Sequence, residues 1–232
     1  MLTPPFLTSD EWGVLALSVS VAARAVLVGL PLAVAVGWTM ARTRFPGRTL
    51  IDAVLHSSLF LPPVVVGLVL ILLFGTDGPV GKLLAGFGIR LIFTANGAAL
   101  AAGVMAFPLM LRACRQAIDS VDPKLDAVAA SLGAGFWDRM FSVTLPLAAP
   151  GLIAAAVIGF AAALGEFGAV ITFAANIPGE TQTLALAIYS ALQQPGGEAV
   201  ALRLAGISFT VAIAALLLSE ALLAYGRKRA GA

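Results

Sequence analysis

A glycine-rich stretch with a lysine, GTDGPVGKL at residues 75–83, is the part of this sequence that comes nearest to a catalytic motif. The phosphate-binding loop of nucleotide hydrolases reads G-x-x-x-x-G-K-[ST], and its last hydroxyl binds Mg²⁺. Here Thr76 stands at the first glycine position and Leu83 replaces the Ser or Thr. We therefore expect no nucleotide site in this chain.

Residue counts argue against metal and disulfide chemistry. The 232 residues include one cysteine, Cys114, and one histidine, His56. A single cysteine excludes an internal disulfide, and one Cys with one His is too few for a structural zinc site. We expect no metal site and no cofactor bound by this chain itself.

The composition places the chain in a membrane. Sixty per cent of its residues are hydrophobic and 11% are charged, whereas soluble domains have ~45–50% apolar and ~25% charged residues. We expect a single transmembrane domain over residues 1–232. The net charge of +2 arises from few charges and gives no reason to expect a nucleic-acid partner.

Apolar segments long enough to cross a bilayer, which takes ~20 helical residues, occur five times. They cover about residues 13–41, 53–74, 94–111, 147–173 and 204–225. Pro62-Pro63 and Pro108 interrupt helical hydrogen bonding, so the second and third spans are expected to kink. The predicted fold class is all-α and integral to the membrane, with five spanning helices.

Basic residues indicate the orientation of these spans, because loops rich in Lys and Arg face the cytosol. With the N-terminus outside, ten of the fourteen Lys and Arg residues are cytosolic: Arg42, Arg44, Arg48, Arg112, Arg115, Lys124, Arg139, Arg227, Lys228 and Arg229. The opposite loops hold Lys82 and Arg90, with Arg203 at a span edge. We predict an outer N-terminus and a cytosolic C-terminus.

Three ionisable side chains lie inside the spans, where such groups usually face a bundle interior or a cavity. Arg24 lies about 11 residues into the first span, roughly 16 Å by helical rise and near mid-membrane. It either meets an anion in transit or pairs with a carboxylate or helix-end carbonyls. Glu220 lies toward the cytosolic end and is expected to reach the membrane surface. Glu166 lies late in the fourth span.

A cytosolic loop over about 115–146 differs from the spans. Asp122-Pro123 is typical of a helix cap followed by proline at the first helical position. Gly133 stands where a helix ends in a left-handed residue. A second short turn carries Phe136, Trp137, Met140 and Phe141, and we expect Leu145-Pro146 to end it.

Two helices this short are marginal alone in water, and an apolar patch on such a loop usually marks a contact surface. A helix lying on lipid headgroups is the alternative interpretation. Such helices favour Lys and Arg on the polar face, whereas this loop carries Asp122, Asp126 and Asp138. We interpret the loop as an element that fits a groove on a cytosolic partner.

The loop resembles the EAA loop of ABC importer permeases, in which an EAA-like triplet precedes a glycine and nine residues separate that glycine from an I-x-L-P ending. Gly133 is followed by nine residues and then by VTLP, and DAVAA at 126–130 stands near the triplet. The departures are Asp for Glu, one position early, and Val for Ile. The resemblance implies docking into an ATPase subunit through Asp126, Ala129, Ala130, Gly133, Phe136, Trp137, Met140, Val143, Leu145 and Pro146.

A second stretch, GEFGAVITFAANIPGETQTLALAIYSALQQPGGEA at 165–199, resembles the permeases of molybdate importers. Its parts GEFG, NIPGET and QPGG carry the resemblance. Sulfate/thiosulfate permeases share the first part and usually diverge after it, so they remain the alternative. The resemblance covers nearly the whole chain and implies the type I ABC importer fold, with molybdate or tungstate as cargo.

The same resemblance implies a multi-pass protein of the cell inner membrane that works as a homodimer. Its partners are then two ABC ATPase subunits, which bind ATP and Mg²⁺, and a periplasmic molybdate-binding protein. Arg24, Gly165, Glu166, Phe167 and Gly168 are the candidate residues of the translocation pathway or gate. A carboxylate on the pathway would repel a dianion, so we expect Glu166 to fix a bend or subunit contact.

Two other classes of function remain open at this point. A proton-driven secondary transporter would need titratable groups along the path, and Glu166 and Glu220 are its candidates. A purely structural membrane subunit would carry no solute at all.

Overall fold

The computed structural model describes residues 8–43 and 45–230, including their side chains except those of 222–230. Arg44 and the side chains of Arg227, Lys228 and Arg229 lie outside the described residues. The structure therefore gives no position for these four of the ten basic side chains that are predicted to be cytosolic. In the described ranges the regular secondary structure is helical. Its elements are α1 (Ser9–Arg42), α2 (Arg48–His56), η1 (Ser57–Leu59), α3 (Pro63–Phe74), α4 (Pro79–Ala85), α5 (Ala95–Asp119), α6 (Pro123–Ser131), α7 (Phe136–Arg139), η2 (Met140–Thr144), α8 (Leu145–Leu164), α9 (Gly168–Ala174), α10 (Leu184–Leu192) and α11 (Glu198–Ala230).

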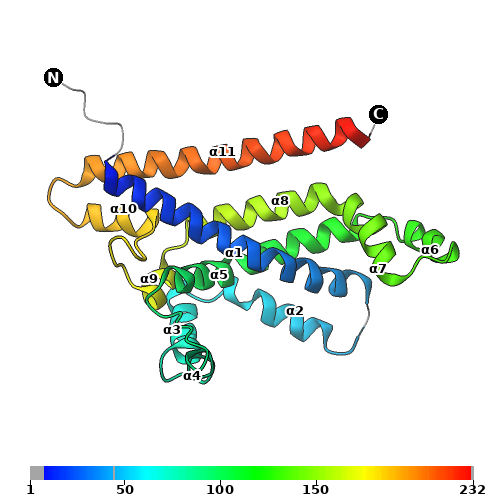
Figure 1. Ribbon diagram of the computed structural model, residues 1–232, viewed down its shortest axis with the longest axis horizontal. Coiled ribbons are helices and arrows are strands. Elements are labelled where there is room, and N and C mark those ends of the chain that lie inside the picture. The colour runs from blue at the N-terminus through cyan, green and yellow to red at the C-terminus, as the bar shows by residue number, and fades with distance from the viewer. Residues whose placement is uncertain (1–7, 44, 231–232) are drawn as a thin grey trace.

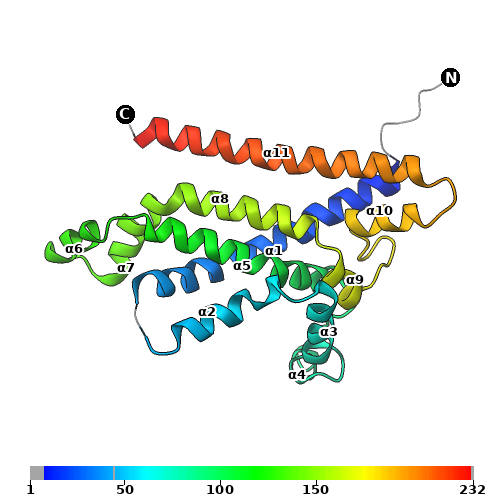
Figure 2. The same ribbon diagram turned by 180° about the vertical axis from the view of Figure 1, so that it is seen from behind.

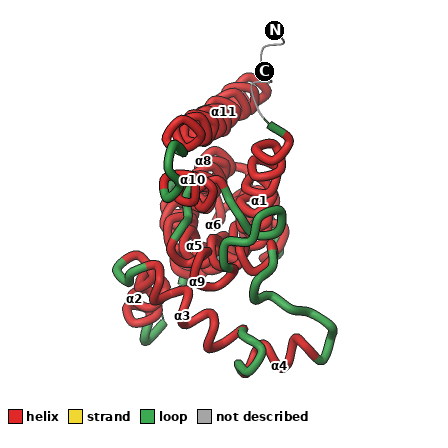
Figure 3. The backbone as a smooth tube through the Cα atoms, turned by 90° about the vertical axis from the view of Figure 1, so that its left-hand side faces the viewer, coloured by secondary structure: helices red, strands yellow, loops and turns green. Residues whose placement is uncertain are grey.

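The centre of the molecule is a bundle of α1, α5 and α8, and α11 lies along α8 and α10 (Figure 1). Seen from behind, α6 and α7 project from one end, while α3 and α4 stand away from the bundle nearer the other end (Figure 2). The view along the bundle shows α2 and α4 on its outside (Figure 3).

Small side chains allow the three central helices to pack closely. Ala22, Ala102, Ala106 and Ala155 are all fully buried. A methyl group added to Gly159 of α8 would lie 2.4 Å from the sulfur of Met110. Because lipid tails are as apolar as the side chains, close packing rather than hydrophobic burial holds such helices together.

Four helical stretches are long and apolar enough to cross a membrane: Ser9–Arg42, Ala95–Asp119, Phe136–Leu164 and Glu198–Ala221. Arg48–Leu59 with Pro63–Phe74 makes a fifth if this bent pair is one span. The predicted all-α membrane fold is confirmed. The first, third and fifth spans lie inside longer helices than the apolar segments 13–41, 94–111 and 204–225 indicate.

The second predicted span, 53–74, is not one straight helix. Its two halves meet at a bend of 110°, and the break falls at Pro62-Pro63, where proline removes backbone donors and disfavours helix in the residue before it. The 12 residues of α3 are about 18 Å long. Neither half alone therefore crosses a ~30 Å hydrocarbon layer.

The fourth predicted span, 147–173, also differs from the structure at both ends. Helix begins upstream at Phe136, and Leu145-Pro146 does not end it, because the π-helical turns of η2 lead directly into α8. The Leu145 amide donates to the Met140 carbonyl five residues back, and this wider turn accommodates Pro146, which has no amide of its own. At the far end α8 stops at Leu164, and α9 is a separate helix.

The glycine-rich stretch 75–83 forms the tight turn between α3 and α4 and the first part of α4. A methyl group on Gly81 would lie 1.8 Å from the carbonyl oxygen of Gly75. Backbone contact thus accounts for these glycines without a phosphate.

Candidate functional site

Local capping builds the first half of the loop at the end of the bundle. The Asp122 carboxylate accepts a hydrogen bond of 2.9 Å from the Lys124 amide, with Pro123 in the first turn of α6. The helix ends at Gly133, whose φ is +89°, and a glycine adopts this left-handed conformation without steric cost. Both features agree with their sequence predictions.

The second half of the loop presents an aromatic surface. Phe136 and Trp137 pack edge to face with ring centroids 5.0 Å apart, and Trp137 stacks on Phe141 at 6.2 Å. Trp137 is nevertheless 66% exposed and Phe141 61% exposed. On α6, Leu125, Val128 and Leu132 are exposed as well. We call the exposed apolar side chains of 125–141 the loop surface, and an apolar surface of this kind is typical of an interface.

An ion pair joins the two halves of the loop. Arg139 Nη1 lies 2.8 Å from Asp126 Oδ2, between α7 and α6. A hollow of about 350 Å³ lies beside it, lined by residues of α6, α7, η2 and the turn between them, among them Ala129, Gly133 and Val143. Of the predicted docking residues, the structure thus gathers Ala129, Gly133 and Val143 around one hollow, and Asp126 pairs with Arg139, which also lines it. Met140, Leu145 and Pro146 continue into the helix of the fourth span.

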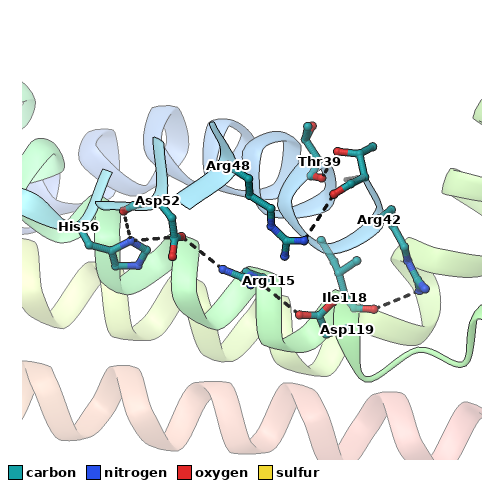
Figure 4. A network of polar contacts seen from close by, with 9 residues as sticks. Thr39, Arg42, Arg48, Asp52, His56, Arg115, Ile118 and Asp119 are labelled. Carbon is teal, nitrogen blue, oxygen red and sulfur yellow. Dashed lines mark hydrogen bonds and ion pairs between the residues drawn. The ribbon is translucent and has the colours of Figure 1, made fainter. Parts of the chain in front are cut away.

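Two contacts that sequence reasoning missed connect the loop region to α1. The Trp38 and Phe136 rings pack edge to face, with centroids 4.9 Å apart. Arg42 Nη2 donates to the Ile118 carbonyl of α5 at 3.2 Å (Figure 4). It also donates to the Val121 carbonyl at 2.9 Å, just past the end of α5. A cation at a helix C-terminus satisfies carbonyls that lack an intrahelical partner.

A polar network joins α2 to the C-terminal part of α5 (Figure 4). Arg115 Nη1 lies 3.3 Å from Asp52 Oδ1, and its Nε lies 3.7 Å from Asp119 Oδ2. His56 Nδ1 lies 2.8 Å from the Asp52 carbonyl. His56 therefore contacts the backbone of its own helix, α2.

The candidate gate residues lie where α8 gives way to α9. Glu166 Oε1 accepts a hydrogen bond of 2.8 Å from the Ala169 amide and so caps α9. The Phe167 ring contacts the Tyr189 ring with centroids 4.9 Å apart. The hydrogen bond agrees with the expectation that Glu166 fixes a bend.

The candidate gate residues also contact the bent second span, a contact that the sequence did not indicate. A methyl group on Gly168 would lie 2.7 Å from Cβ of Pro63, and one on Gly67 would lie 2.6 Å from Cβ of Thr172. The break in the fourth span therefore packs against the break in the second.

Arg24 lies elsewhere. Its Nη1 donates to Asn96 Oδ1 at 2.9 Å, so its partner is an amide and neither a carboxylate nor a helix-end carbonyl. The groove that it lines, between α1 and α5, contains none of residues 165–168. Glu220 is exposed on α11, and its expected place at the membrane surface stays a prediction. Buried Glu11 pairs with Arg203 Nε at 2.8 Å, which ties the start of α1 to α11.

The comparison with protein families decides the class of this molecule. A family described as the inner membrane component of binding-protein-dependent transport systems matches residues 29–225. The chain belongs to this family. It is accordingly a multi-pass permease of the inner membrane.

Several curated permeases are similar to this one over most of its length. The molybdenum transport system permease protein ModB of Escherichia coli K12 is 50% identical over 226 residues, covering 97% of this chain and 99% of that protein. ModB of Haemophilus influenzae is 47% identical over 216 residues, covering 93% and 94%. The sulfate transport system permease protein CysT of E. coli is 38% identical over 167 residues, covering 71% and 60%.

Solved structures support the fold of the permease. A bacterial alginate ABC transporter in complex with its pentasaccharide-bound periplasmic protein has a chain with a TM-score of 0.72 at 17% identity, covering 92% of this chain and 78% of that chain. An inward-facing MetNI methionine ABC transporter gives a TM-score of 0.68 at 16% identity, covering 97% and 99%. The predicted type I ABC importer fold is thereby confirmed.

Proposed function

We propose that this permease carries molybdate across the inner membrane, and with it tungstate, an oxyanion of the same charge and shape. The observation that carries the proposal is the 50% identity to a molybdenum permease over 97% of the chain. The sulfate permease matches less of this chain at lower identity. Sulfate import is therefore the second candidate.

Two copies of the chain with two ATPase subunits and a periplasmic molybdate-binding protein make up the proposed assembly. The N-terminus faces the periplasm, and the loop surface faces the cytosol. ATP and Mg²⁺ bind to the ATPase subunits, and this chain does no chemistry of its own. The exposed Trp137 and Phe141 support ATPase docking, since an aromatic patch of this kind is costly to leave in water without a partner.

In the proposed cycle, closure of the two ATPase subunits on ATP moves the loop surfaces of the two permease copies together. The Asp126–Arg139 ion pair makes α6 and α7 move as one unit. The Trp38–Phe136 contact passes part of this movement to α1. The binding protein then releases its oxyanion into an outward-facing cavity between the two copies.

The proposed outer gate consists of Gly165, Glu166, Phe167 and Gly168 with the parts of α3 against which they pack. Glu166 contributes by holding the start of α9, because its carboxylate is engaged with the Ala169 amide. The cargo is expected to bind weakly, through small polar groups and backbone dipoles, so that it leaves the pathway readily. Arg24 is not included, because its groove contains no gate residue.

Uptake of labelled molybdate at submicromolar concentration tests the proposal. Cells that lack the chain are compared with cells in which it is restored, with and without excess sulfate. Uptake that depends on the chain and persists in sulfate supports a molybdate importer, and uptake that sulfate abolishes moves the assignment to a sulfate permease. Uptake that persists without the ATPase subunit would instead favour proton-driven transport, and the absence of any chain-dependent flux would leave a structural subunit.

A further inference from the structure

Arg24 is a charged side chain that the proposed transport cycle does not use. It is exposed on α1, and its guanidinium donates to the Asn96 amide oxygen. No carboxylate among the described residues forms an ion pair with it. A guanidinium on the outside of a membrane bundle is costly unless an anion or water reaches it.

The depth of Arg24 follows from two contacts between α1 and α5. Arg24 meets Asn96, and Arg42 meets the Ile118 carbonyl, so the two helices run in the same direction. The two contacts are separated by 18 residues on α1 and 22 on α5, or about 27 and 33 Å by helical rise. The hydrocarbon layer of a bilayer is ~30 Å thick. If Arg42 lies at the inner boundary, as the proposed orientation implies, these contacts put Arg24 near the outer boundary instead of at mid-membrane.

A groove of about 390 Å³ begins at this arginine and runs between α1 and α5. Arg24 and Asn96 lie at its outer end. Along the helices its walls are Val28, Leu32, Leu100, Val104 and Phe107. From Arg24 to Leu32 is about 12 Å and from Asn96 to Phe107 about 16 Å. These lengths match one leaflet, half of the ~30 Å layer.

We propose that this groove binds a phospholipid of the outer leaflet that carries net negative charge, with its phosphate on Arg24 and one acyl chain along the apolar walls. A guanidinium forms charge-assisted hydrogen bonds to phosphate oxygens. Asn96 holds the guanidinium through one nitrogen, which leaves its other donors for the lipid. The assignment of the leaflet rests on the proposed orientation of the chain, whereas the site itself does not depend on the cargo.

The walls of the groove argue for a lipid over the transported oxyanion. A free tetrahedral dianion needs donors on several sides, and burying its oxygens against hydrocarbon is costly. Beyond Arg24 and Asn96 the side chains that line the groove are hydrocarbon. A lipid satisfies both ends, since only its headgroup needs donors.

Native mass spectrometry of the permease with its ATPase subunit in mild detergent tests the proposal. The probes are dioleoyl phosphatidylglycerol and zwitterionic dioleoyl phosphatidylcholine, each added at equal concentration. Both lipids carry a phosphate, but the choline cation of phosphatidylcholine repels the Arg24 guanidinium and phosphatidylglycerol has no such cation. We therefore expect retention of the anionic lipid to exceed that of the zwitterionic one about tenfold.

Two variants and one control separate headgroup from chain. Arg24→Gln should reduce the preference to less than about twofold if the guanidinium supplies it. Val28→Trp fills the groove from an exposed position and should lower retention of both lipids while Arg24 remains. Arg90→Gln changes another exposed arginine and should leave the preference intact.

Four outcomes would overturn the proposal. Equal retention of both lipids by the unchanged protein, or an unaltered preference in Arg24→Gln, would remove the lipid site. Displacement of the lipid by millimolar molybdate or inorganic phosphate would assign Arg24 to a free oxyanion. Loss of the dimer in Arg24→Gln would assign the groove to a second copy of the chain. Chain-dependent molybdate uptake is measured separately, so a failed lipid site and a failed transport function are distinguishable.

Discussion

Replacement of Trp137 by alanine is the most direct perturbation of the loop surface. The side chain is 66% exposed and contacts Phe136 and Phe141. If the loop surface docks into an ATPase subunit, most of this exposed area becomes buried in the complex. We therefore expect Trp137→Ala to weaken binding of the ATPase subunit strongly while the permease itself stays folded.

The size of the effect follows from the exposed area. An aromatic side chain buries about 200 Å², and two-thirds of that area at ~25 cal/mol per Å² gives about 3 kcal/mol. Aromatic anchors at interfaces contribute ~2 kcal/mol or more when truncated. A loss of ~2–3 kcal/mol weakens the complex roughly 30- to 150-fold.

The assay is the affinity of the ATPase subunit for permease in lipid nanodiscs, with molybdate uptake measured in parallel. Trp12→Ala is the matched control, because Trp12 is 57% exposed and lies at the opposite end of α1 from the loop. The reasoning is refuted if Trp137→Ala binds the ATPase subunit within about twofold of the unchanged permease. Equal losses in both variants would also refute it, since general damage to the bundle would then explain the result.

Three further predictions concern the loop and the gate. Gly133→Ala should destabilise the local loop structure by ~1–2 kcal/mol, because φ is +89° there, and should therefore speed hydrogen exchange around 128–136. Gly135→Ala is the control and should not speed exchange, because φ is −68° at that residue. The Asp126–Arg139 pair is partly exposed, so Asp126→Asn and Arg139→Met should each shift the unfolding free energy by less than about 1 kcal/mol. A double-mutant cycle on the affinity of the ATPase subunit should nevertheless show that the two residues are coupled. Additive losses of affinity would contradict a role of the pair in docking. Glu166→Gln keeps an acceptor for the Ala169 amide and should retain uptake, while Glu166→Ala should lose a cap of ~1 kcal/mol and most uptake. Equal loss of uptake in the Gln and Ala variants would favour proton coupling.

The loop was the most predictable part of the molecule because its determinants are local. A cap at Asp122, a proline in the first turn and a glycine at the end of α6 each act within a few residues, so the sequence places them correctly. The fourth span is different, because Glu166 is the only charged residue from α8 through α9 and hydropathy continues the span across it. The helix nevertheless breaks at 165–167, where the Glu166 carboxylate accepts a hydrogen bond from the Ala169 amide. Every Asp or Glu stands three residues before an amide, so the sequence does not show which of them caps a helix.

Contacts between distant segments could not be predicted. Pro62-Pro63 indicates a break but not a bend of 110°, whose direction fits the close approach of Gly67 to Thr172 and of Gly168 to Pro63. The Trp38–Phe136 contact joins residues that are far apart in the sequence and have no local pattern in common. The Arg24–Asn96 hydrogen bond likewise joins two segments that are far apart in the sequence.

The uninterrupted helix from Phe136 to Leu164 makes the fourth span a lever. It is 29 residues long, about 43 Å by helical rise, with the aromatic residues of the proposed docking surface at one end and Gly165 just past the other. A tilt of about 5° of a rod this long displaces its far end by roughly 4 Å. The π-helical turns at Met140–Thr144 lie near the cytosolic end of this helix in the proposed orientation. Because π-helical turns are rare and less regular than α-helical ones, we expect the helix to bend most easily there. A substitution that restores ordinary α-helical turns there would stiffen the helix. We expect it to change how far a movement of the proposed ATPase subunits displaces the proposed gate residues.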